Sequence, residues 1–571
     1  MQIKVIFINK ARKRGLIIQM ISKNERKLLE FLFENQEGYS INELARKTGI
    51  SVGSAHLILK EWDKEGLVIA QRLGNSISYR LQKDHGKIQL LLPVLGKRDS
   101  KKRTKILGTL GPACWTAEKL RELLDAGVNA VRINGSHATK EDIEGLMALV
   151  RSVDSSIPIL LDIPGAKIRL RELAKEMRIE KDQEVIFSSE NDDGALPVDT
   201  RGLHKKVLPG MNFSMDDGTL GFIVESVDRT RIICRSLNSG IVRSRKGINI
   251  PDIRPEKDAL SARDRKLLLA GLEQGISFVG VSFIQEPKQI DPILGLLKGT
   301  PCKLISKIET KAAMSHYREI ISLSYGVMID RGDLGAEVGL EKIPRLQKRI
   351  IAECNRQGKP IIVATQMLDS MTQSLYPTKA EITDVANAVI DGASALMLSA
   401  ETAVGKYPLE TVKVMSSIIR DIESDTSYHV ELFHPEEPDI TDVMGSVAAE
   451  IIQNLDITKV VCVTSGGYSA RMLARRRLPV PILAVTNKKE IESRLHLIWG
   501  VTPVLVSTPI DHSGNAIQKK SIIEECIAKG ELSEQDVILL IAAVFPNNRK
   551  ITNMIEVHKV SELLGYFGGR T

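Results

Sequence analysis

The chain has 571 residues, of which 43% are hydrophobic and 26% are charged, and its formal net charge is +8. This ordinary composition excludes a disordered or fibrous protein, and the length predicts three or four domains at about 150 residues each. No apolar run approaches the roughly 20 residues of a membrane span. The six cysteines form neither a C-x-x-C pair nor a zinc spacing, so we expect reduced, buried thiols and a cytoplasmic location.

The positive charge is concentrated at the N-terminus. Residues 1–100 hold 18 Lys and Arg against 10 Asp and Glu, a net charge of +8, so the rest of the chain is neutral overall. Such asymmetry indicates a separate basic module that meets a polyanion, or a solvated basic tail. We divide this region into a basic extension at 1–23, a folded module at 24–85 and a charged linker at 86–103.

The folded module is predicted to be helical and then to turn to strands. Apolar residues recur at helical spacing over Lys27–Phe33, and Ser40–Lys47 and Ser51–Glu65 read as a second and a third helix. A hairpin follows over Leu67–Arg80. This order resembles the winged helix-turn-helix family, in which the third helix enters the DNA major groove and the wing contacts the backbone.

The resemblance implies a set of candidate DNA contacts on the third helix and near the wing. They are Ser54, His56, Lys60, Arg72 and Arg80. Winged helices also serve as dimerisation or docking modules, and the acidic end of the third helix (Glu61, Asp63, Glu65) disfavours contact with phosphates. Both interpretations stay open at this point.

From Lys105 onward, short apolar runs alternate with amphipathic stretches, which predicts a parallel α/β fold. The runs are Lys105–Leu110, Asn129–Asn134, Pro158–Ile163, Phe278–Phe283, Lys303–Glu309, Tyr325–Asp330, Pro360–Met367 and Ser394–Ser399. Eight such strands predict a (β/α)8 TIM barrel at 104–168 and 255–424, with its active site at the carboxyl ends of the strands. Polar and charged residues gather at those ends, among them Arg132, Asp162, Lys307, Glu309, Asp333 and Thr365.

Two further domains are expected around this barrel. About a hundred residues separate the third and fourth strands, far more than a βα loop needs, and their β-like segments predict a β-rich lid domain at 169–254. A new α/β unit at 425–571 follows the barrel. Its predicted strands are Lys459–Val463, Pro481–Val485, Thr502–Val506 and Asp536–Ala542.

Several long strings in the barrel region occur in one order. They are Thr104–Leu107 with Gly111–Ala113, Val131–His137, Ile305–Glu309, Arg331–Gly335, Ala364–Leu368, Pro377–Glu381 with Asp384–Val389, and Met397–Thr402. Together they resemble the pyruvate kinase family over about residues 104–571. The resemblance implies phosphoryl transfer from phosphoenolpyruvate to ADP, giving pyruvate and ATP, by a homotetramer.

The resemblance also implies roles for individual residues. Glu309 and Asp333 would bind Mg²⁺ or Mn²⁺, and Lys307, which shares a strand face with Glu309, would stabilise the phosphoryl group in flight. Arg132 suits the phosphate oxygens, and Thr365 would help to deliver the proton that makes pyruvate. Gly332 would let the backbone approach the substrate carboxylate. The nucleotide-phosphate matches are Asn134, His137, Arg169 and Lys246.

The third strand departs from the pattern of K⁺-dependent family members. Ile163 stands where they have a Thr, and Lys167 stands where they have a Glu. The monovalent-cation residues Asn134, Ser136 and Asp162 remain. We expect the Lys167 ammonium to replace K⁺ electrostatically, so that activity needs no K⁺; the other interpretation is a lysine that points into water.

Other departures leave a second function open. Asp330 replaces a small residue, Ala400 replaces a glycine, and Gly135 replaces an aromatic residue, which would thin the local packing. With the basic module, Asp330 and Ala400 favour the alternative of a transcription regulator that uses a pyruvate-kinase-like body as a metabolite sensor. The complete set of Lys307, Glu309, Asp333 and Thr365 opposes that alternative.

The C-terminal domain has a loop suited to phosphate. Thr464–Ala470 leads into a helix and forms a plausible phosphate nest, which by resemblance would hold a phosphorylated effector. The later glycine-rich effector loop of the family is replaced by Phe545–Lys550. The identity of the effector therefore stays open.

Overall fold

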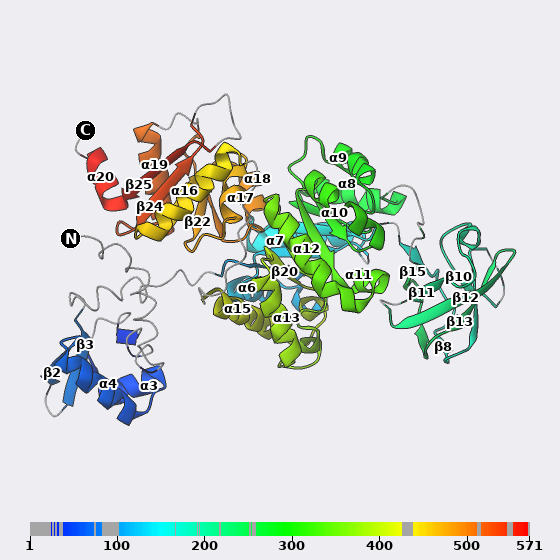
Figure 1. Cartoon of the computed structure of the whole chain (residues 1–571), viewed down its shortest axis with the longest axis horizontal. Helices are drawn as coiled ribbons and strands as arrows, with labels where there is room; N and C mark the ends of the chain where they lie inside the picture. Colours follow the sequence, from blue (N-terminus) through cyan, green and yellow to red (C-terminus); the bar gives the residue numbers. More distant parts are fainter. Residues whose placement is uncertain are drawn as a thin grey trace, which may run out of the picture. The chain divides into compact units, whose positions relative to one another are not determined.

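The computed structural model describes residues 24, 28, 31–32, 38–73, 76–82, 102–136, 138–165, 167–190, 192, 194–215, 218–250, 253, 259–424, 438–510, 515–544 and 552–568. The chain forms two compact units, Met1–Ser100 and Lys101–Thr571 (Figure 1). None of the described helices is long and apolar enough to cross a bilayer. All six cysteines are buried and free, as the sequence predicts.

Among its described residues, the first unit has the helices α3 and α4 and a small sheet. Its elements are β1 (Tyr39–Ser40), α3 (Ile41–Thr48), α4 (Val52–Lys64), β2 (Val68–Leu73) and β3 (Ser76–Leu81), with sheet order β1-β3-β2. The Ser40 hydroxyl caps α3 in a capping box with Glu43, and Gly49 ends it at φ 68°. Of the predicted first helix, only Leu28, Phe31 and Leu32 are described. The winged-helix class of this unit stays a prediction.

The second unit is built around eight parallel strands that close into a barrel, which confirms the predicted architecture. In barrel order they are β4 (Lys105–Thr109), β5 (Ala130–Asn134), β6 (Ile159–Ile163), β16 (Phe278–Val281), β17 (Lys303–Ile308), β18 (Gly326–Asp330), β19 (Ile361–Ala364) and β20 (Ala395–Leu398). The surrounding helices are α6 (Ala117–Ala126), α7 (Lys140–Val153), α8 (Ala262–Glu273), α9 (Ile290–Leu297), α10 (Lys311–Leu323), α11 (Arg331–Val338), α12 (Ile343–Arg356), α13 (Lys379–Ile390), α14 (Ala400–Ala403) and α15 (Pro408–Ser424).

Alternation along each strand sorts side chains between the barrel interior and the helix layer. The interior cluster includes Leu107, Ala130, Phe278 and Met328, and Leu497 of the C-terminal domain packs among them. Lys105 Nζ donates to the Val501 carbonyl at 2.7 Å, so this contact lies at the amino ends of the strands. Because the amino end is apolar and covered, the opposite, carboxyl end is left to carry chemistry.

The lid is a β domain with its own core. Its seven-stranded sheet has the order β10-β9-β13-β12-β11-β15-β7, and β14 pairs with β8. The strands are β7 (Ile168–Arg169), β8 (Met177–Ile179), β9 (Glu184–Ser188), β10 (Leu196–Pro197), β11 (Asn212–Met215), β12 (Leu220–Asp228), β13 (Arg231–Ser236), β14 (Gly240–Val242) and β15 (Gly247–Asn249). Phe187, Phe213 and Phe222 form its aromatic centre. The strand that enters the lid, β7, pairs antiparallel with the strand that leaves it, β15, with Arg169 opposite Gly247. This pairing closes the base of the lid.

The C-terminal domain is a five-stranded sheet with helices against it (Figure 1). Its elements are α16 (Ile440–Asn454), β21 (Lys459–Val463), α17 (Tyr468–Ala474), β22 (Ile482–Thr486), α18 (Lys489–Leu495), β23 (Val501–Leu505), α19 (Ala516–Ala528), β24 (Val537–Ala542), β25 (Met554–Lys559) and α20 (Val560–Gly568). The four predicted strands are present and parallel. The edge strand β25, antiparallel to β24, was not expected.

Candidate active site

A buried lysine lies at the centre of the carboxyl end of the barrel. Lys307 Nζ is 2.8 Å from Glu309 Oε1, 3.3 Å from Asp330 Oδ2 and 3.5 Å from Asp162 Oδ2, and it donates to Ser282 Oγ at 2.9 Å. Burial disfavours the charged form, yet the three carboxylates together raise the pKa of Lys307 well above its ordinary value. The ammonium is therefore fixed and charged.

Arg132 is held beside this lysine by the same carboxylate. Its Nε donates to Asp162 Oδ2 at 2.8 Å, its Nη2 is 2.7 Å from that oxygen, and its Nη1 donates to Thr109 Oγ1 at 3.3 Å. The guanidinium is buried. An arginine and a lysine with fixed positions provide two cationic groups for the oxygens of a phosphoryl group.

Three carboxylates form a cluster that fits a divalent cation. Glu309, Asp330 and Asp333 each offer an oxygen, and these oxygens lie within 4.8 Å of one another. Burial raises the pKa of Glu309 to about 8 and also raises the pKa of Asp333. Glu309 and Asp333 resist ionisation because they are buried close to other carboxylates, and a hard divalent cation with oxygen ligands would relieve this excess of negative charge.

The cluster is anchored by the backbone. Glu309 Oε2 accepts from the Phe283 N–H at 2.8 Å, and Phe283 is a non-glycine residue at φ 58° just after β16. Such a backbone conformation is uncommon for a side-chain-bearing residue and is found where surrounding structure holds it in place. The Glu309 carboxylate is thereby oriented from the neighbouring strand.

Lys167 points into this end of the barrel and not into water. Its side chain is 12% exposed, its Nζ is 2.5 Å from Asp333 Oδ1, and it lies over the Phe283 ring at 5.2 Å from the centroid. The ammonium thus contacts one of the carboxylates expected to hold the metal. It comes from the segment between β6 and the lid strand β7.

Thr365 lies beside the carboxylate cluster on a strained loop. It has φ 68°, and its Oγ1 accepts from the Gly332 N–H at 3.1 Å. Arg331 donates to the Thr365 carbonyl at 2.6 Å and pairs with Asp384 at 2.6 Å. The sequence places Arg331 within one of the motif strings without revealing its partners, and only the fold shows that this arginine holds the Thr365 loop.

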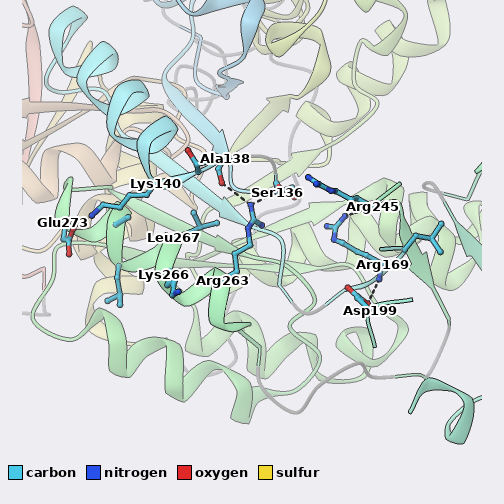
Figure 2. A pocket seen from close by; sticks show the side chains of 14 residues that line it. Ser136, Ala138, Lys140, Arg169, Asp199, Arg245, Arg263, Lys266, Leu267 and Glu273 are labelled. Atoms are coloured by element: carbon cyan, nitrogen blue, oxygen red, sulfur yellow. Dashed lines mark hydrogen bonds and ion pairs between the residues drawn. The ribbon is translucent and has the colours of Figure 1, made fainter. Parts of the chain in front are cut away.

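A cavity of about 860 Å³ lies between the lid base, α8 and the loop after β5. Figure 2 shows Arg169 and Arg245 of the lid together at one end, with Lys140 and Glu273 at the other. Arg263 donates to the carbonyls of Gly135, Ser136 and Ala138 and so holds that loop. Five cationic side chains line the cavity against two acidic ones, which suits a polyanion.

The predicted nucleotide residues are only partly gathered in this cavity. Arg169 lines it, whereas Lys246 is absent from its wall and Arg245 is there instead. Asn134 Oδ1 accepts from the Ser136 N–H at 3.1 Å and therefore orders the loop. His137 lies outside the described residues.

Two of the departures from the family pattern have local explanations. A Cβ on Gly135 would come within 2.7 Å of the Asp162 carbonyl oxygen, which accepts from the Gly135 N–H at 2.8 Å. Glycine therefore permits a close backbone approach at this position. Ala400 begins α14, where helical backbone accommodates alanine without strain.

The DNA candidates belong to the first unit, and the effector candidates belong to the C-terminal domain of the second. His56, Lys60, Arg72 and Arg80 are exposed, whereas the backbone N–H of Ser54 donates to Ser51 Oγ in the N-cap of α4. In the Thr464–Ala470 loop, the Gly467 N–H donates to Thr464 Oγ1 at 2.9 Å, with Gly467 at φ 78°. Phe545–Lys550 lies outside the described residues.

Comparison with known proteins agrees with this geometry. The family model described as "Pyruvate kinase, barrel domain" matches residues 101–412, and "Pyruvate kinase, alpha/beta domain" matches 442–558. Pyruvate kinase of Geobacillus stearothermophilus is 33% identical over 481 residues, covering 81% of each chain. The Clostridium acetobutylicum enzyme is 33% identical, covering 80% of this chain and 99% of its own. The Agrobacterium vitis enzyme is 36% identical, covering 78% and 94%.

A closed (β/α)8 barrel with fixed cations and a carboxylate cluster at its carboxyl end defines an enzyme that acts on an anionic substrate with a divalent ion. The chain belongs to the pyruvate kinase family. The prediction from the motif strings is confirmed, and the comparisons give no support to the alternative of a transcription regulator.

Proposed function

We propose that this chain transfers a phosphoryl group from phosphoenolpyruvate to ADP at the carboxyl end of the barrel, giving pyruvate and ATP. The observation that carries the proposal is the Lys307 ammonium, which is buried among three carboxylates. A fixed charge of this kind stabilises the transferring group without reorganisation at the moment of reaction.

Each half of the reaction has its own residues. Arg132 binds the substrate phosphate, and Lys307 stabilises the phosphoryl group as it moves. Glu309 and Asp333 hold Mg²⁺ or Mn²⁺, which when bound supplies positive charge to the substrate oxygens. The Gly332 backbone approaches the substrate carboxylate, and Thr365 helps to place a proton on the enolate carbon.

The nucleotide binds, on this proposal, in the cavity at the lid base. Arg169 and Arg245 contact its phosphates, and Ser136 lies on the ordered loop opposite them. Asn134, His137 and Lys246 remain candidates by resemblance to the family. Closure of the lid over this cavity would exclude water from the transfer step.

We also propose that Lys167 supplies the charge for which other family members use K⁺. The support is its place inside the barrel end, 2.5 Å from Asp333. Asn134, Ser136 and Asp162 still offer oxygens for a monovalent cation at an edge of the same site, so residual stimulation by K⁺ is compatible with the proposal.

We also propose a cytoplasmic location, a homotetramer and two further binding partners. Six buried free thiols agree with a cytoplasmic location, and exposed Leu340 and Tyr376 of the barrel agree with a homotetramer. We propose a phosphorylated effector at the Thr464–Ala470 loop by resemblance to the family, and DNA as a partner of the basic N-terminal unit.

A coupled assay tests the reaction directly. Pyruvate formation from phosphoenolpyruvate and ADP is measured while Mg²⁺ is titrated, for the wild-type chain and for Glu309→Gln. We expect turnover by the wild-type chain and little Mg²⁺-dependent activity in the variant, with Glu286→Gln at the same end of the barrel as the control. A wild-type chain that forms no pyruvate at any Mg²⁺ concentration would overturn the proposed function.

A further inference from the structure

Asp330 points into the active site. Met328, two residues earlier on β18, belongs to the interior cluster, and side chains two apart on a strand share a face. Asp330 therefore faces the barrel interior, where it is 8% exposed. Burial raises its pKa, but Lys307, Arg132 and Lys167 outweigh this and hold the pKa of Asp330 below its ordinary value, so the group is ionised.

An aspartate at the position of Asp330 would ordinarily cap a helix. Asp330 is the N-cap residue of α11, where an aspartate usually accepts from the backbone N–H groups of the first turn. Asp330 makes no such side-chain bond. Its carboxylate is turned instead toward the site, at the expense of a common source of helix stability.

The carboxylate bridges two groups that belong to different halves of the reaction. Its Oδ2 is 3.3 Å from Lys307 Nζ, and its Oδ1 accepts from Thr365 Oγ1 at 3.2 Å. The Thr365 hydroxyl has one hydrogen, and its own neighbour Ala364 offers a carbonyl at 2.6 Å. The Gly332 N–H donates to the hydroxyl oxygen, so the hydrogen points to one of two acceptors, and the charged Asp330 carboxylate competes for it with the nearer, neutral Ala364 carbonyl.

We propose that Asp330 is a positioning residue that fixes the Lys307 ammonium and the Thr365 hydroxyl in one network. This inference rests on the proposed function and adds a residue to it. The network ties the group that stabilises phosphoryl transfer to the group that assists protonation of the enolate. The cost is one negative charge close to the bound phosphate, which weakens binding of the anionic substrate.

The proposal predicts opposite changes in two kinetic constants. Asp330→Ala removes the bridge, so kcat should fall about tenfold or more, as expected for loss of an ordered proton-transfer group. It also removes a negative charge, so the KM for phosphoenolpyruvate should fall. A residue that only supports the fold would lower kcat without tightening substrate binding.

Proton exchange isolates the second half of the reaction. By microscopic reversibility, the groups that protonate the enolate also remove a proton from the pyruvate methyl group, so deuterium uptake from D₂O follows this step by NMR. We expect Asp330→Ala and Asp330→Asn to slow exchange, in the presence of Mg²⁺ and ATP, by about tenfold. In a Thr365→Val chain, adding Asp330→Ala should slow exchange no further, since the two residues act through one bond.

Matched measurements separate the possible results. Asp369→Asn removes an exposed carboxylate near the same end of the barrel and should leave both constants unchanged. Unchanged kcat, KM and exchange in both Asp330 variants, with wild-type turnover intact, would overturn the inference alone. A Mg²⁺ requirement raised tenfold in Asp330→Asn would make Asp330 a metal ligand and also overturn it. A wild-type chain without turnover would overturn the proposed function and the inference together.

Discussion

At the scale of single residues, the site depends on charges that have no access to bulk water. Lys307 and Glu309 are nearly or completely buried, and the Lys307 ammonium is stabilised by the carboxylates around it, Glu309 among them. Removing one member leaves the others unpaired, which is far more costly than removing an exposed ion pair. Substitutions here should therefore affect catalysis and stability together.

Lys307→Met should lower kcat by about two to three orders of magnitude, because one fixed donor to a developing charge is commonly worth that much. Steady-state kinetics measure the effect. Lys303→Met, on the same strand at the opposite end of the barrel, is the control and should keep most of the activity. Near wild-type turnover by Lys307→Met would remove this lysine from the mechanism.

The orientation of the Asp330 side chain could not be predicted from the sequence. Every residue of β18 is buried, on both faces of the strand, so polarity does not reveal which face lines the barrel interior. The contact of Lys167 with Asp333 joins residues from distant segments, and no local pattern encodes it. By contrast, Lys307 lies on β17 and Glu309 directly follows its last residue, and the period of two along a strand predicts that the two side chains meet, as they do at 2.8 Å.

At the scale of secondary-structure elements, the segment that joins β6 to the lid carries the cation that we expect to replace K⁺. Lys167 lies just before β7, and a Cβ on Gly247 of the paired strand β15 would come within 2.4 Å of the Lys167 Cε. Glycine at 247 therefore leaves room for the lysine to reach Asp333. The lid base and the charge of the site are coupled through this contact.

Activity should be full when a tetramethylammonium or Tris salt replaces KCl at equal ionic strength. Lys167→Glu combined with Ile163→Thr should create a K⁺ requirement, because the pair removes the internal cation and adds a hydroxyl ligand. Lys175→Glu, which makes the same charge change on the lid surface, should not. A wild-type enzyme that is nearly inactive until K⁺ is added would contradict the substitution of K⁺ by Lys167.

The elements themselves were largely predictable. The barrel strands are short apolar runs bounded by polar residues, and Ser40 and Ser51, where the second and third helices were predicted to start, cap α3 and α4 in the structure. The edge strand β25 is not evident from the sequence. It pairs with β24 alone, and its side chains are half-buried or exposed, so polar and apolar residues are mixed along it. Edge strands carry a weaker apolar pattern than central ones.

At the scale of the whole molecule, the barrel and the C-terminal domain share a buried junction that should respond to pH. Burial and the nearby charge of Lys105 lower the pKa of His496 from 6.5 to about 4. The unfolded chain then binds more protons than the folded chain between these values. Stability from this group is present above about pH 6.5 and is lost as pH falls toward 4.

The free energy of unfolding should therefore fall by about 2 kcal/mol on acidification from pH 7 to pH 4.5, and His496→Gln should reduce this dependence. Urea unfolding followed by circular dichroism measures it. His316→Gln, which removes an exposed histidine from α10, is the control and should leave the pH dependence as it is. An identical pH dependence in His496→Gln would contradict the assignment.

The basic N-terminal unit is predicted to bind DNA through its positively charged side chains. If it binds DNA, affinity should fall with salt at a slope of about −0.9 per phosphate neutralised. Lys60→Ala combined with Arg80→Ala in the full chain should weaken binding and flatten the slope. Lys413→Ala combined with Lys529→Ala removes two exposed positive charges elsewhere and should change neither. Binding that is absent, or that is insensitive to salt, would favour a docking role for this unit.

The presence of Leu497 among the interior residues of the barrel has a consequence for how the protein is made. A ribosome delivers all eight barrel strands before it reaches this leucine. Until then the apolar interior is open at the amino ends of the strands, and a nascent barrel exposes surface that other chains or chaperones can bind. The barrel therefore completes its core only when the C-terminal domain has been synthesised, and a chain truncated before Leu497 should aggregate during translation.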